Sequence, residues 1–459
     1  MSYSEKVDLL LKKGILVTPD ILKKEFSTRK ELSKSEEETP GKIKIVYNYD
    51  KPSKKRVVDD FVSLFNIRFK NLEKIIRQRS EMQNLVSINK LNLKNEKEIV
   101  SIIGIITKKW QTKNGHTMLF LEDISGSVNV LVNKNNKAVY ELAKDLVQDE
   151  VIGVCGGVGK NIVFSNEIIF PDIPLSNELK KAPEESYAVF ISDIHIGSKV
   201  FLKKNFKKFL SWLNGNLGSE NQRLIAKKTK YLFLVGDLVE GVGVYPNQEE
   251  NLDIPDIKEQ YKQLANLLKT ISSNKKIIIC PGNHDSGRIA EPQPPLYNDF
   301  AKSLWDLSNT IIISNPSVVN IGSSENFSGL DVLLYHGYSL IYYANNVESI
   351  RVQGGQKRVD LLMKFLLQKR HLAPSHESNM YVPDAEEDPL FIDKIPDVFV
   401  TGHIHRASAS QYRGVTLLNT SCWVDITEDQ EKRGLEPQPA RAITLNLQTR
   451  KVKIINFYG

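Results

Sequence analysis

Potential metal ligands stand at five places in the sequence, each directly after a strongly apolar stretch. They are Asp193 and His195 in SDIH, Asp237 in GD, Asn283 with His284 and Asp285 in GNHD, His336 in HG, and His403 with His405 in GHIH. Carboxylate and amide oxygens with imidazole nitrogens, and no thiolate, suit a divalent cation in a nitrogen and oxygen site. The pattern predicts such a site, with Mn²⁺ expected first and Mg²⁺, Fe or Zn²⁺ as alternatives.

The apolar stretches before these residues indicate the strands of a layered α/β domain. They read YAVFIS, KYLFLVG, KKIIIC, LDVLLY and PDVFV, and further strands are expected near 415–419 and within 441–457. Near-continuous apolar strands are typical of sheets that are buried on both faces. Since ligands bind outside the carboxyl ends of strands in open α/β sheets, the five motifs should converge on one crevice.

Two of the motifs place candidate ligands two residues apart. In an extended segment, residues i and i+2 point to the same side of the backbone. We therefore expect Asp193 and His195 to face one metal cluster together, and His403 and His405 to do the same.

The order D-x-H, G-D, G-N-H-D, H-G and G-H-x-H resembles the calcineurin-like metallophosphoesterases, and five motifs in this order make a specific pattern. The resemblance implies a centre of two metal ions. One ion is assigned to Asp193, His195 and His405, the second to Asn283, His336 and His403, and Asp237 is the bridge between them. Two such ions can activate water, polarise phosphoryl oxygens and neutralise charge during in-line attack.

The same resemblance implies that His284 is the general acid that protonates the departing oxygen or stabilises charge on the phosphoryl group. A histidine that only supports the metal ligands is the alternative. Asp285 is expected to orient His284 or to cap the loop rather than to bind metal.

The sequence before this domain has a different character. Residues 96–175 contain short alternating or β-branched runs, and five strands with one helix between the third and fourth are the order of an OB-fold barrel, although other small barrels could give a similar string. Further upstream we predict a helical module at 1–33, a charged, flexible linker at 34–56 and a helical lead-in at 57–95. The phosphoesterase-like domain is expected over 186–459.

The predicted fold class is therefore α/β. It comprises a calcineurin-like sandwich of two packed sheets flanked by helices, preceded by an OB-fold barrel and the small helical module. An OB-like barrel directly before such a domain resembles the small, or B, subunits of replicative DNA polymerases, and the archaeal family D small subunits in particular. Agreement with the latter extends to EGVGVYPNQEE, PGNHDSGRIAEPQPP and NTSCWVDITEDQEKRGLEPQPARA, and the resemblance covers about 57–459.

This resemblance implies docking to the large catalytic polymerase subunit and a 3′-to-5′ exonuclease that proofreads DNA. Single-stranded or mispaired 3′ ends are the expected substrates, because an unpaired end reaches a recessed site at a lower unpairing cost. Every ligand position is filled, so an active site is expected. A non-catalytic scaffold subunit is the main alternative, and a free repair nuclease or phosphatase is a third.

Tyr245 and Arg288 are candidates for binding the DNA itself. An aromatic ring can stack on a base, and a guanidinium group can hold a phosphate. The alternatives are that Tyr245 packs within its own loop and that Arg288 pairs with Glu291.

Composition sets only broad limits. The chain has 459 residues, of which 41% are apolar and 25% charged, as in ordinary globular proteins of several domains. The net charge of +7 fits contact with DNA without deciding it. Three widely spaced cysteines suggest no disulfide framework, and no export signal or membrane span is evident. We expect a cytoplasmic protein without membrane contact; no sliding-clamp peptide stands out, so contact with the clamp would be indirect.

Overall fold

The computed structural model describes residues 42–458, except 428, 429, 431 and 433. By its internal contacts the chain divides after residue 42 into two units. The helical module predicted for 1–33 lies outside the described residues. In the described part, no helix combines the length and the apolar character needed to cross a membrane.

Five strands close into a barrel within the range where the sequence predicts an OB fold. They are β2 (Ile99–Gln111), β3 (Thr117–Asp123), β4 (Gly126–Val132), β5 (Val151–Gly159) and β6 (Ile162–Ile169), in the order β2-β3-β4-β6-β5. Helix α4 (Lys137–Lys144) lies between the third and fourth of them, as predicted. Alternate residues such as Val100, Ile102 and Leu119 fill the barrel, because successive side chains of a strand point to opposite faces.

Two six-stranded sheets follow the barrel. The first has the order β1 (Lys42–Asn48), β11 (Ser317–Ser323), β12 (Leu330–Leu334), β13 (Val398–Thr401), β15 (Val415–Asn419) and β14 (Ser408–Tyr412). The second has the order β10 (Thr310–Ile312), β9 (Lys276–Cys280), β8 (Thr229–Val235), β7 (Tyr187–Ile191), β16 (Arg441–Asn446) and β17 (Val452–Asn456). Strands β7, β8 and β9 are parallel, and so are β12, β13 and β15, so each sheet gathers several carboxyl ends at one edge.

Apolar side chains of both sheets share one buried core. Phe190 of β7 stacks on Phe233 of β8 with ring centroids 4.9 Å apart, and Val332 and Val398 of the first sheet belong to the same cluster. Burial of these side chains from water holds the two sheets face to face.

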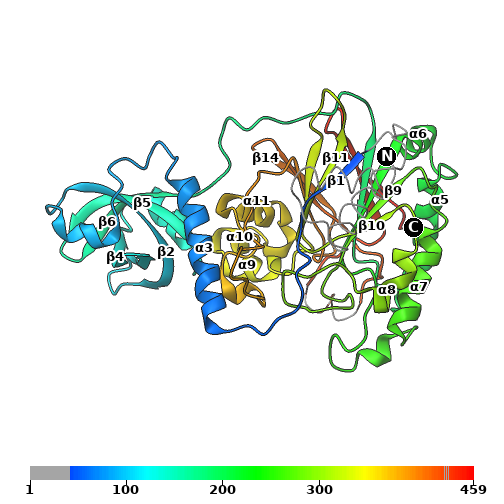
Figure 1. The fold of residues 1–459 in the computed structure, drawn as a ribbon, viewed down its shortest axis with the longest axis horizontal. Helices are drawn as coiled ribbons and strands as arrows, with labels where there is room; N and C mark the ends of the chain where they lie inside the picture. The colour runs from blue at the N-terminus through cyan, green and yellow to red at the C-terminus, as the bar shows by residue number, and fades with distance from the viewer. Residues whose placement is uncertain (1–41, 428–429, 431, 433, 459) are drawn as a thin grey trace, which may run out of the picture. The chain divides into compact units, whose positions relative to one another are not determined.

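Helices cover the outer faces of both sheets (Figure 1). Helices α5 (Lys203–Leu213), α6 (Glu220–Lys228), α7 (Ile257–Leu268) and α8 (Asn298–Trp305) pack on the second sheet. Helices α9 (Leu340–Asn346), α10 (Glu348–Val352) and α11 (Val359–Lys369) pack on the first. The layers are therefore helix, sheet, sheet and helix.

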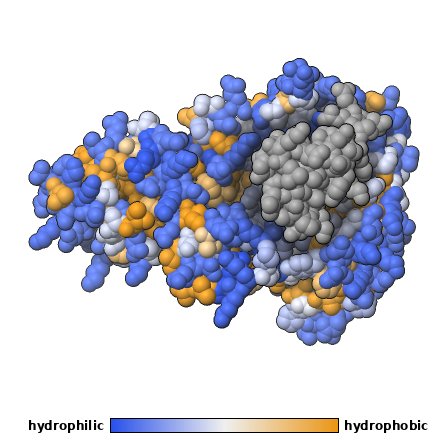
Figure 2. Space-filling model, viewed as in Figure 1, coloured by the Kyte–Doolittle hydropathy of each residue, from blue (hydrophilic) through white to orange (hydrophobic). Residues whose placement is uncertain are grey.

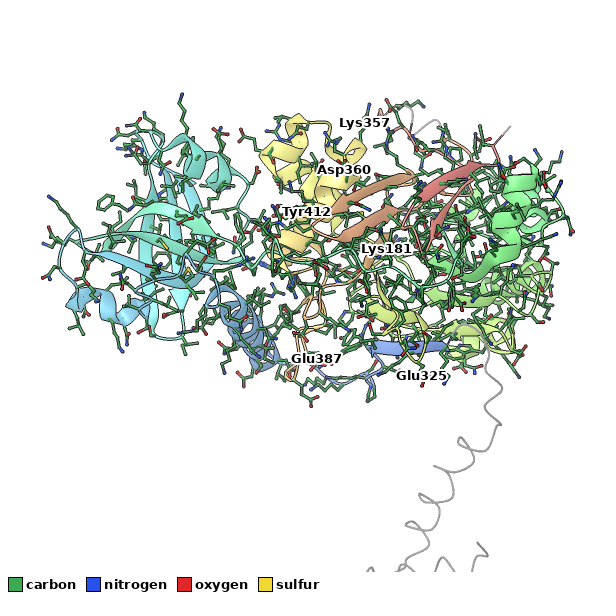
Figure 3. The ribbon with its side chains drawn as sticks, turned by 90° about the horizontal axis from the view of Figure 1, so that it is seen from above. Lys181, Glu325, Lys357, Asp360, Glu387 and Tyr412 are labelled. Atoms are coloured by element: carbon green, nitrogen blue, oxygen red, sulfur yellow. The ribbon has the colours of Figure 1, made fainter. Side chains whose placement is uncertain are left out.

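The segment predicted as a flexible linker, 34–56, contains strand β1 in the structure. Tyr49, just after the strand, donates its backbone N–H to Ser314 Oγ at 2.7 Å and its hydroxyl to Asp384 at 2.9 Å. Glu387 accepts the Tyr47 hydroxyl at 3.2 Å and lies beside this segment in Figure 3. The correction has a simple reason: KIKIVYN alternates with period two, as an edge strand does, while its charged residues suggested a linker.

Helix α3 (Val58–Ile76) occupies the predicted lead-in together with the short helix η1 (Ile88–Leu93). Its Arg68 is buried and donates to Asp388 Oδ2 at 2.7 Å. His371 Nε2 lies 2.9 Å from the same oxygen, and its Nδ1 accepts the backbone N–H of Ala373 at 3.0 Å. Nε2 therefore carries the hydrogen of a neutral imidazole, and helix α3 is fixed to the loop after α11 by a buried network.

The barrel is attached in the same manner. Glu150 of the barrel and Lys369 at the end of α11 are both buried, with 2.7 Å between carboxylate and ammonium. The ammonium also lies 3.7 Å from the centre of the Phe170 ring. Tyr412 of β14, labelled in Figure 3, donates its hydroxyl to Asp172 just after the barrel at 2.6 Å.

Substitution of Arg68 should strongly destabilise the protein. Arg68→Met leaves the buried Asp388 carboxylate without its guanidinium partner, and such losses cost about 3–5 kcal/mol. Urea unfolding followed by circular dichroism measures the change. Arg77→Ala at the C-cap of the same helix is the control, because the Arg77 side chain is 60% exposed and its pair with Glu73 should contribute less than about 1 kcal/mol. Equal effects of the two substitutions would contradict the structural role of Arg68.

The same network predicts a loss of stability in acid. Burial and the charge of Arg68 lower the pKa of His371, so the unfolded chain takes up this proton more readily below about pH 6.5. Arg68 and His371 outweigh burial and hold the pKa of Asp388 below its usual range. Protonation of Asp388 therefore adds a further loss of unfolding free energy below about pH 4. Both contributions are present above the ordinary pKa values and disappear as the pH falls. A His371→Gln variant should show a shallower decline of unfolding free energy between about pH 7 and pH 5; an unchanged decline would refute this assignment.

Candidate metal centre

Every candidate ligand lies in a loop directly after a strand. Asp193 and His195 follow β7, Asp237 follows β8, Asn283 follows β9, His336 follows β12, and His403 with His405 follows β13. The first three strands belong to one sheet and the last two to the other. The five loops meet because the two packed sheets bring their carboxyl ends together.

One group of ligands comprises Asp193, His195 and His405, whose ligand atoms all lie within 4.8 Å of one another. Asp193 Oδ1 is 3.2 Å from His405 Nε2. Asp193 Oδ1, both ring nitrogens of His195 and Nδ1 of His405 are buried without a hydrogen-bond partner. Buried polar atoms without partners are costly and rare, so this group fits a bound cation.

A second group comprises Asp237, His336 and His403, also with ligand atoms within 4.8 Å of one another. His336 Nε2 lies 3.3 Å from Asp237 Oδ2 and 3.1 Å from Asn283 Oδ1. Its Nδ1 lies 2.9 Å from the carbonyl of Val235, which can only accept a hydrogen. Nδ1 therefore carries a hydrogen, which leaves Nε2 as the nitrogen that could bind a metal ion after losing its proton.

Asp237 lies between the two groups. Its Oδ2, which contacts His336, is also 3.9 Å from Nε2 of His195 in the first group. Its Oδ1 accepts the backbone N–H of His284 at 2.9 Å, which fixes the carboxylate. This is the position that the sequence resemblance assigns to the bridging ligand.

The ligand loops have a left-handed backbone rather than an extended one. Positive φ angles occur at Asp193 (50°), His195 (53°), Asp237 (50°), His403 (66°) and His405 (56°). The expectation that the paired ligands face one side because the backbone is extended is therefore corrected. Residues other than glycine adopt this conformation at an energetic cost, which is typically found where function requires it.

Two glycines allow the loops to approach this closely. A Cβ added to Gly236 would lie 2.3 Å from His336 Nδ1, and one added to Gly282 would lie 2.3 Å from Asp237 Oδ1. Neither position leaves room for a side chain, so only glycine lets the loops approach this closely.

Glu240 is a buried acid of the centre that the motifs do not mark. With His195 and His284 it forms a third group whose ligand atoms lie within 4.8 Å of one another. Its Oε2 is 3.0 Å from Nδ1 of His195, although the two are not aligned for a hydrogen bond. Its backbone carbonyl lies 2.8 Å from Nδ1 of His284 and orients that ring. The carboxylate thus supports the ligand His195, as second partners of metal-binding histidines do.

Asp285 caps the loop and does not orient the His284 ring. Its Oδ2 accepts backbone N–H groups of Gly282 at 2.8 Å and Leu238 at 3.2 Å, and its Oδ1 accepts the Tyr261 hydroxyl at 3.1 Å. The second of the two roles expected from the sequence is therefore the one observed.

The two candidate DNA contacts are held by their own surroundings. Tyr245 donates its hydroxyl to Glu240 Oε1 at 3.0 Å, and its ring lies 6.3 Å from that of His284. Arg288 donates to the carbonyl of Pro292, with Nε at 2.8 Å, and lies over the Tyr49 ring instead of pairing with Glu291. Tyr245 adjoins the centre, whereas the guanidinium group of Arg288 is engaged elsewhere.

Comparison with known proteins assigns a family. The family model for the B subunit of DNA polymerases alpha and epsilon matches residues 188–410, which include every ligand of the centre. A model described as OB-fold nucleic acid binding domain matches residues 100–173, which form the barrel. Among solved structures, an asparaginyl-tRNA synthetase from Pyrococcus horikoshii covers 19% of this chain and 22% of that one at 19% identity and a TM-score of 0.17, too little to support an argument.

Curated relatives match most of the chain. The DNA polymerase II small subunit of Methanothermobacter thermautotrophicus is 40% identical over 389 residues, which cover 85% of this chain and 78% of that one. The Pyrococcus abyssi protein of the same name is 36% identical and covers 100% of this chain and 72% of its own. The chain belongs to the archaeal family D polymerase small subunits. It spans 64% of the Pyrococcus furiosus relative, to which it is 39% identical.

The centre of this small subunit concentrates negative charge. Burial alone would raise the pKa of Asp193, Asp237 and Glu240, but neighbouring histidines outweigh burial and lower all three, that of Glu240 to about 2. Three buried carboxylates are thus anionic at neutral pH. Buried anions require compensating positive charge, which divalent cations would supply.

The pKa values of the histidines shift in different directions. Burial would lower the pKa of His336, but the Asp237 carboxylate outweighs it and raises the pKa to about 10. Burial and then the charge of His336 lower the pKa of His403 to about 3. Burial also lowers the pKa of His284, whose ring therefore stays neutral near pH 7 with its hydrogen on Nδ1, toward the Glu240 carbonyl.

Loss of the Glu240 carboxylate charge should weaken metal binding. Glu240→Gln removes the anion beside His195 Nδ1, and loss of such a supporting partner typically lowers metal affinity about 10- to 100-fold. Isothermal titration with Mn²⁺ measures the change. Glu249→Gln, nine residues on at an exposed position of the same loop, is the matched control and should leave the affinity unchanged. Equal affinities of the two variants would rule out a supporting role for Glu240.

Proposed function

We propose that this small subunit is a metal-dependent 3′-to-5′ exonuclease that removes nucleotides from DNA 3′ ends within a DNA polymerase complex. The observation that carries the proposal is the convergence of the predicted ligands into two adjoining groups, with Asp237 of the second group also 3.9 Å from His195 of the first. The donor types and their order along the chain support a two-ion centre of the calcineurin-like kind.

The proposed reaction is hydrolysis of the last phosphodiester bond. A water oxygen forms a bond to phosphorus, the bond from phosphorus to the 3′ oxygen breaks, and that oxygen takes up a proton. The products are a nucleoside monophosphate and a strand one nucleotide shorter with a new 3′ hydroxyl. Divalent cations would supply Lewis-acid stabilisation of the phosphoryl oxygens and a lowered pKa of water. Mn²⁺ is the proposed metal, and Mg²⁺, Fe or Zn²⁺ are the alternatives for these donors.

The residues divide into ligands and a proton donor. Asp193, His195 and His405 would hold one ion, Asn283, His336 and His403 the other, and Asp237 both. His284 is the proposed proton donor to the leaving oxygen, and the Glu240 carbonyl holds its ring in place. Since the hydrogen of the neutral ring is on Nδ1, Nε2 must first take up a proton before it can deliver one.

A docking role is proposed beside catalysis. The relatives are named small subunits, so the natural partner is the large catalytic subunit of the same polymerase. Val58, Phe61 and Val62 are exposed by 77%, 43% and 53% on one face of helix α3, and apolar faces of this kind suit a protein partner. Figure 2 shows hydrophobic patches between hydrophilic residues on the visible surface. A scaffold without catalysis is the second candidate function that this face favours.

Nuclease assays with the purified protein and Mn²⁺ test the proposal. A primer with a mismatched 3′ end should be shortened, and His284→Ala should slow this about 100- to 10,000-fold, the usual contribution of an acid catalyst. Asp237→Asn should abolish the activity, because it weakens the ligand shared by both groups. His116→Ala, in a turn of the barrel, is the control and should retain full activity.

Labels at both primer ends decide the direction of attack. Shortening from the 5′ end, or unchanged activity in both variants, would overturn the exonuclease. If chelation lowers the melting temperature but no nuclease appears with Mn²⁺, Mg²⁺, Fe²⁺ or Zn²⁺, the scaffold becomes the better assignment.

A further inference from the structure

A cavity of about 440 Å³ opens beside the metal centre and shares Asn283 and His284 with it. This volume lies within the usual range of small-ligand sites, about 300–1,000 Å³. The apolar and aromatic residues Val242, Ile289, Tyr297 and Phe300 also line the cavity.

These wall residues are not packed away in the protein core. Val242 is 51% exposed, Ile289 37%, Tyr297 40% and Phe300 39%. Apolar and aromatic side chains that stay accessible around a hollow next to catalytic groups are typical of ligand-binding walls.

The cavity is suited to an uncharged ring rather than to a phosphate. None of its described lining residues is a lysine or an arginine. Its one carboxylate, Asp285, is occupied by backbone N–H groups and the Tyr261 hydroxyl. Flat aromatic rings at the rim offer the stacking surface that a nucleobase uses.

A second cavity beside the centre has a different character. This cavity of about 420 Å³ adjoins His403 and His405 and is lined by Arg351, Lys357 and Arg406. Lys357, labelled in Figure 3, and Arg406 lie 2.6 Å and 3.4 Å from Glu436, which offsets part of their charge. Cationic walls suit the phosphates of the strand, so the apolar cavity beside His284 is left for a base.

We propose that the cavity beside His284 binds the base of the penultimate nucleotide at an unpaired DNA 3′ end. This inference rests on the proposed exonuclease. The oxygen that leaves is the 3′ oxygen of the penultimate nucleotide, and His284 is the proposed donor of its proton. The base on the same sugar therefore lies on the side of His284, where the apolar cavity opens.

Base binding in the cavity beside His284 would select the substrate. A base can enter the cavity only after it leaves its partner strand, so at least two unpaired nucleotides are needed at the 3′ end. Paired ends must first be opened, and the free-energy cost of unpairing and unstacking each base protects correctly paired primers.

Abasic substrates combined with a cavity variant test the inference. For the wild type, an abasic penultimate nucleotide should lower kcat/KM about 5- to 100-fold, the range expected from one stacked base. Phe300→Ala should cause a similar loss on ordinary single-stranded DNA, and the two changes together should cause no further loss. Trp305→Ala is the control, since Trp305 lies on the same helix, is 42% exposed and does not line the cavity. The proposal would be overturned if the two changes together multiplied their separate losses of kcat/KM. It would also be overturned if an abasic terminal nucleotide lowered kcat/KM more than an abasic penultimate one.

A binding measurement separates this inference from the exonuclease itself. An oligonucleotide with 2-aminopurine at the penultimate position, bound in the presence of Ca²⁺, should change its fluorescence with the wild type but not with Phe300→Ala. If the fluorescence changes in this way but no nuclease activity is found, the exonuclease proposal fails and the base site is retained. Nuclease activity without a fluorescence change that depends on Phe300 would retain the exonuclease and overturn the base site. If Phe300→Ala instead weakens binding of the large subunit, the cavity is a protein contact and the proposal fails.

Discussion

The rest of this small subunit depends on one constraint, the burial of charged groups where five loops meet. Three carboxylates and five imidazoles lie there. Asp193, Asp237 and Glu240 are each less than 9% exposed, so water can stabilise their charges only weakly. The histidines offset part of the charge by holding protons, as the pKa of His336, raised by Asp237 against burial to about 10, indicates. Divalent cations would take over this role, and their binding energy would then contribute to the stability of the fold.

The sandwich has to hold these groups against their mutual repulsion and against backbone strain. Each candidate ligand follows a strand whose last residues are buried. The strand ends are therefore fixed before the chain turns, and five of the seven candidate ligands, all but Asn283 and His336, then adopt a left-handed conformation. Trp423 and Asp193 illustrate the support: the backbone N–H of Trp423 donates to the Asp193 carbonyl at 2.8 Å, while the Trp423 ring is buried against Phe206. Packing behind the loops therefore keeps the candidate metal ligands in place.

The sequence was sufficient for the main strands and for the convergence of the candidate ligands, because both carry strong local patterns. Apolar runs such as KIIIC and LDVLL are strands β9 and β12, and the residue types at their ends are those of a metal centre. β14 was missed because SASQY carries no apolar signal, and β1 because its charged residues hid the alternation. Such edge strands depend on their partners in the sheet more than on their own composition.

Glu240 could not be found by the same means. In GDLVEG it looks like any charged residue of a loop. Its contact with His195 requires the loop after β8 to turn back toward the loop after β7, and no local pattern encodes this turn. The turn is set by the left-handed Gly241 and by the N–H of Glu240, which donates to the Ile196 carbonyl at 2.9 Å. Likewise, Asp285 could be assigned to the loop only once its three donors were known. Contacts between loops are decided by the three-dimensional path of the chain, which one sequence specifies only indirectly.

The metal ligands alone do not select a substrate, because the same donors can serve the hydrolysis of many phosphoesters. Selection has to come from the walls of the two cavities beside the centre. The walls differ in kind, with Arg351 and Arg406 on the side of His403 and with Tyr297 and Phe300 on the side of His284. In the proposed exonuclease, the phosphates of the strand would follow the cationic wall while one base enters the apolar cavity, and this would orient the strand across the centre. The polarity of cleavage would then be a property of these two walls, and a change of metal would alter the rate without altering the end that is removed.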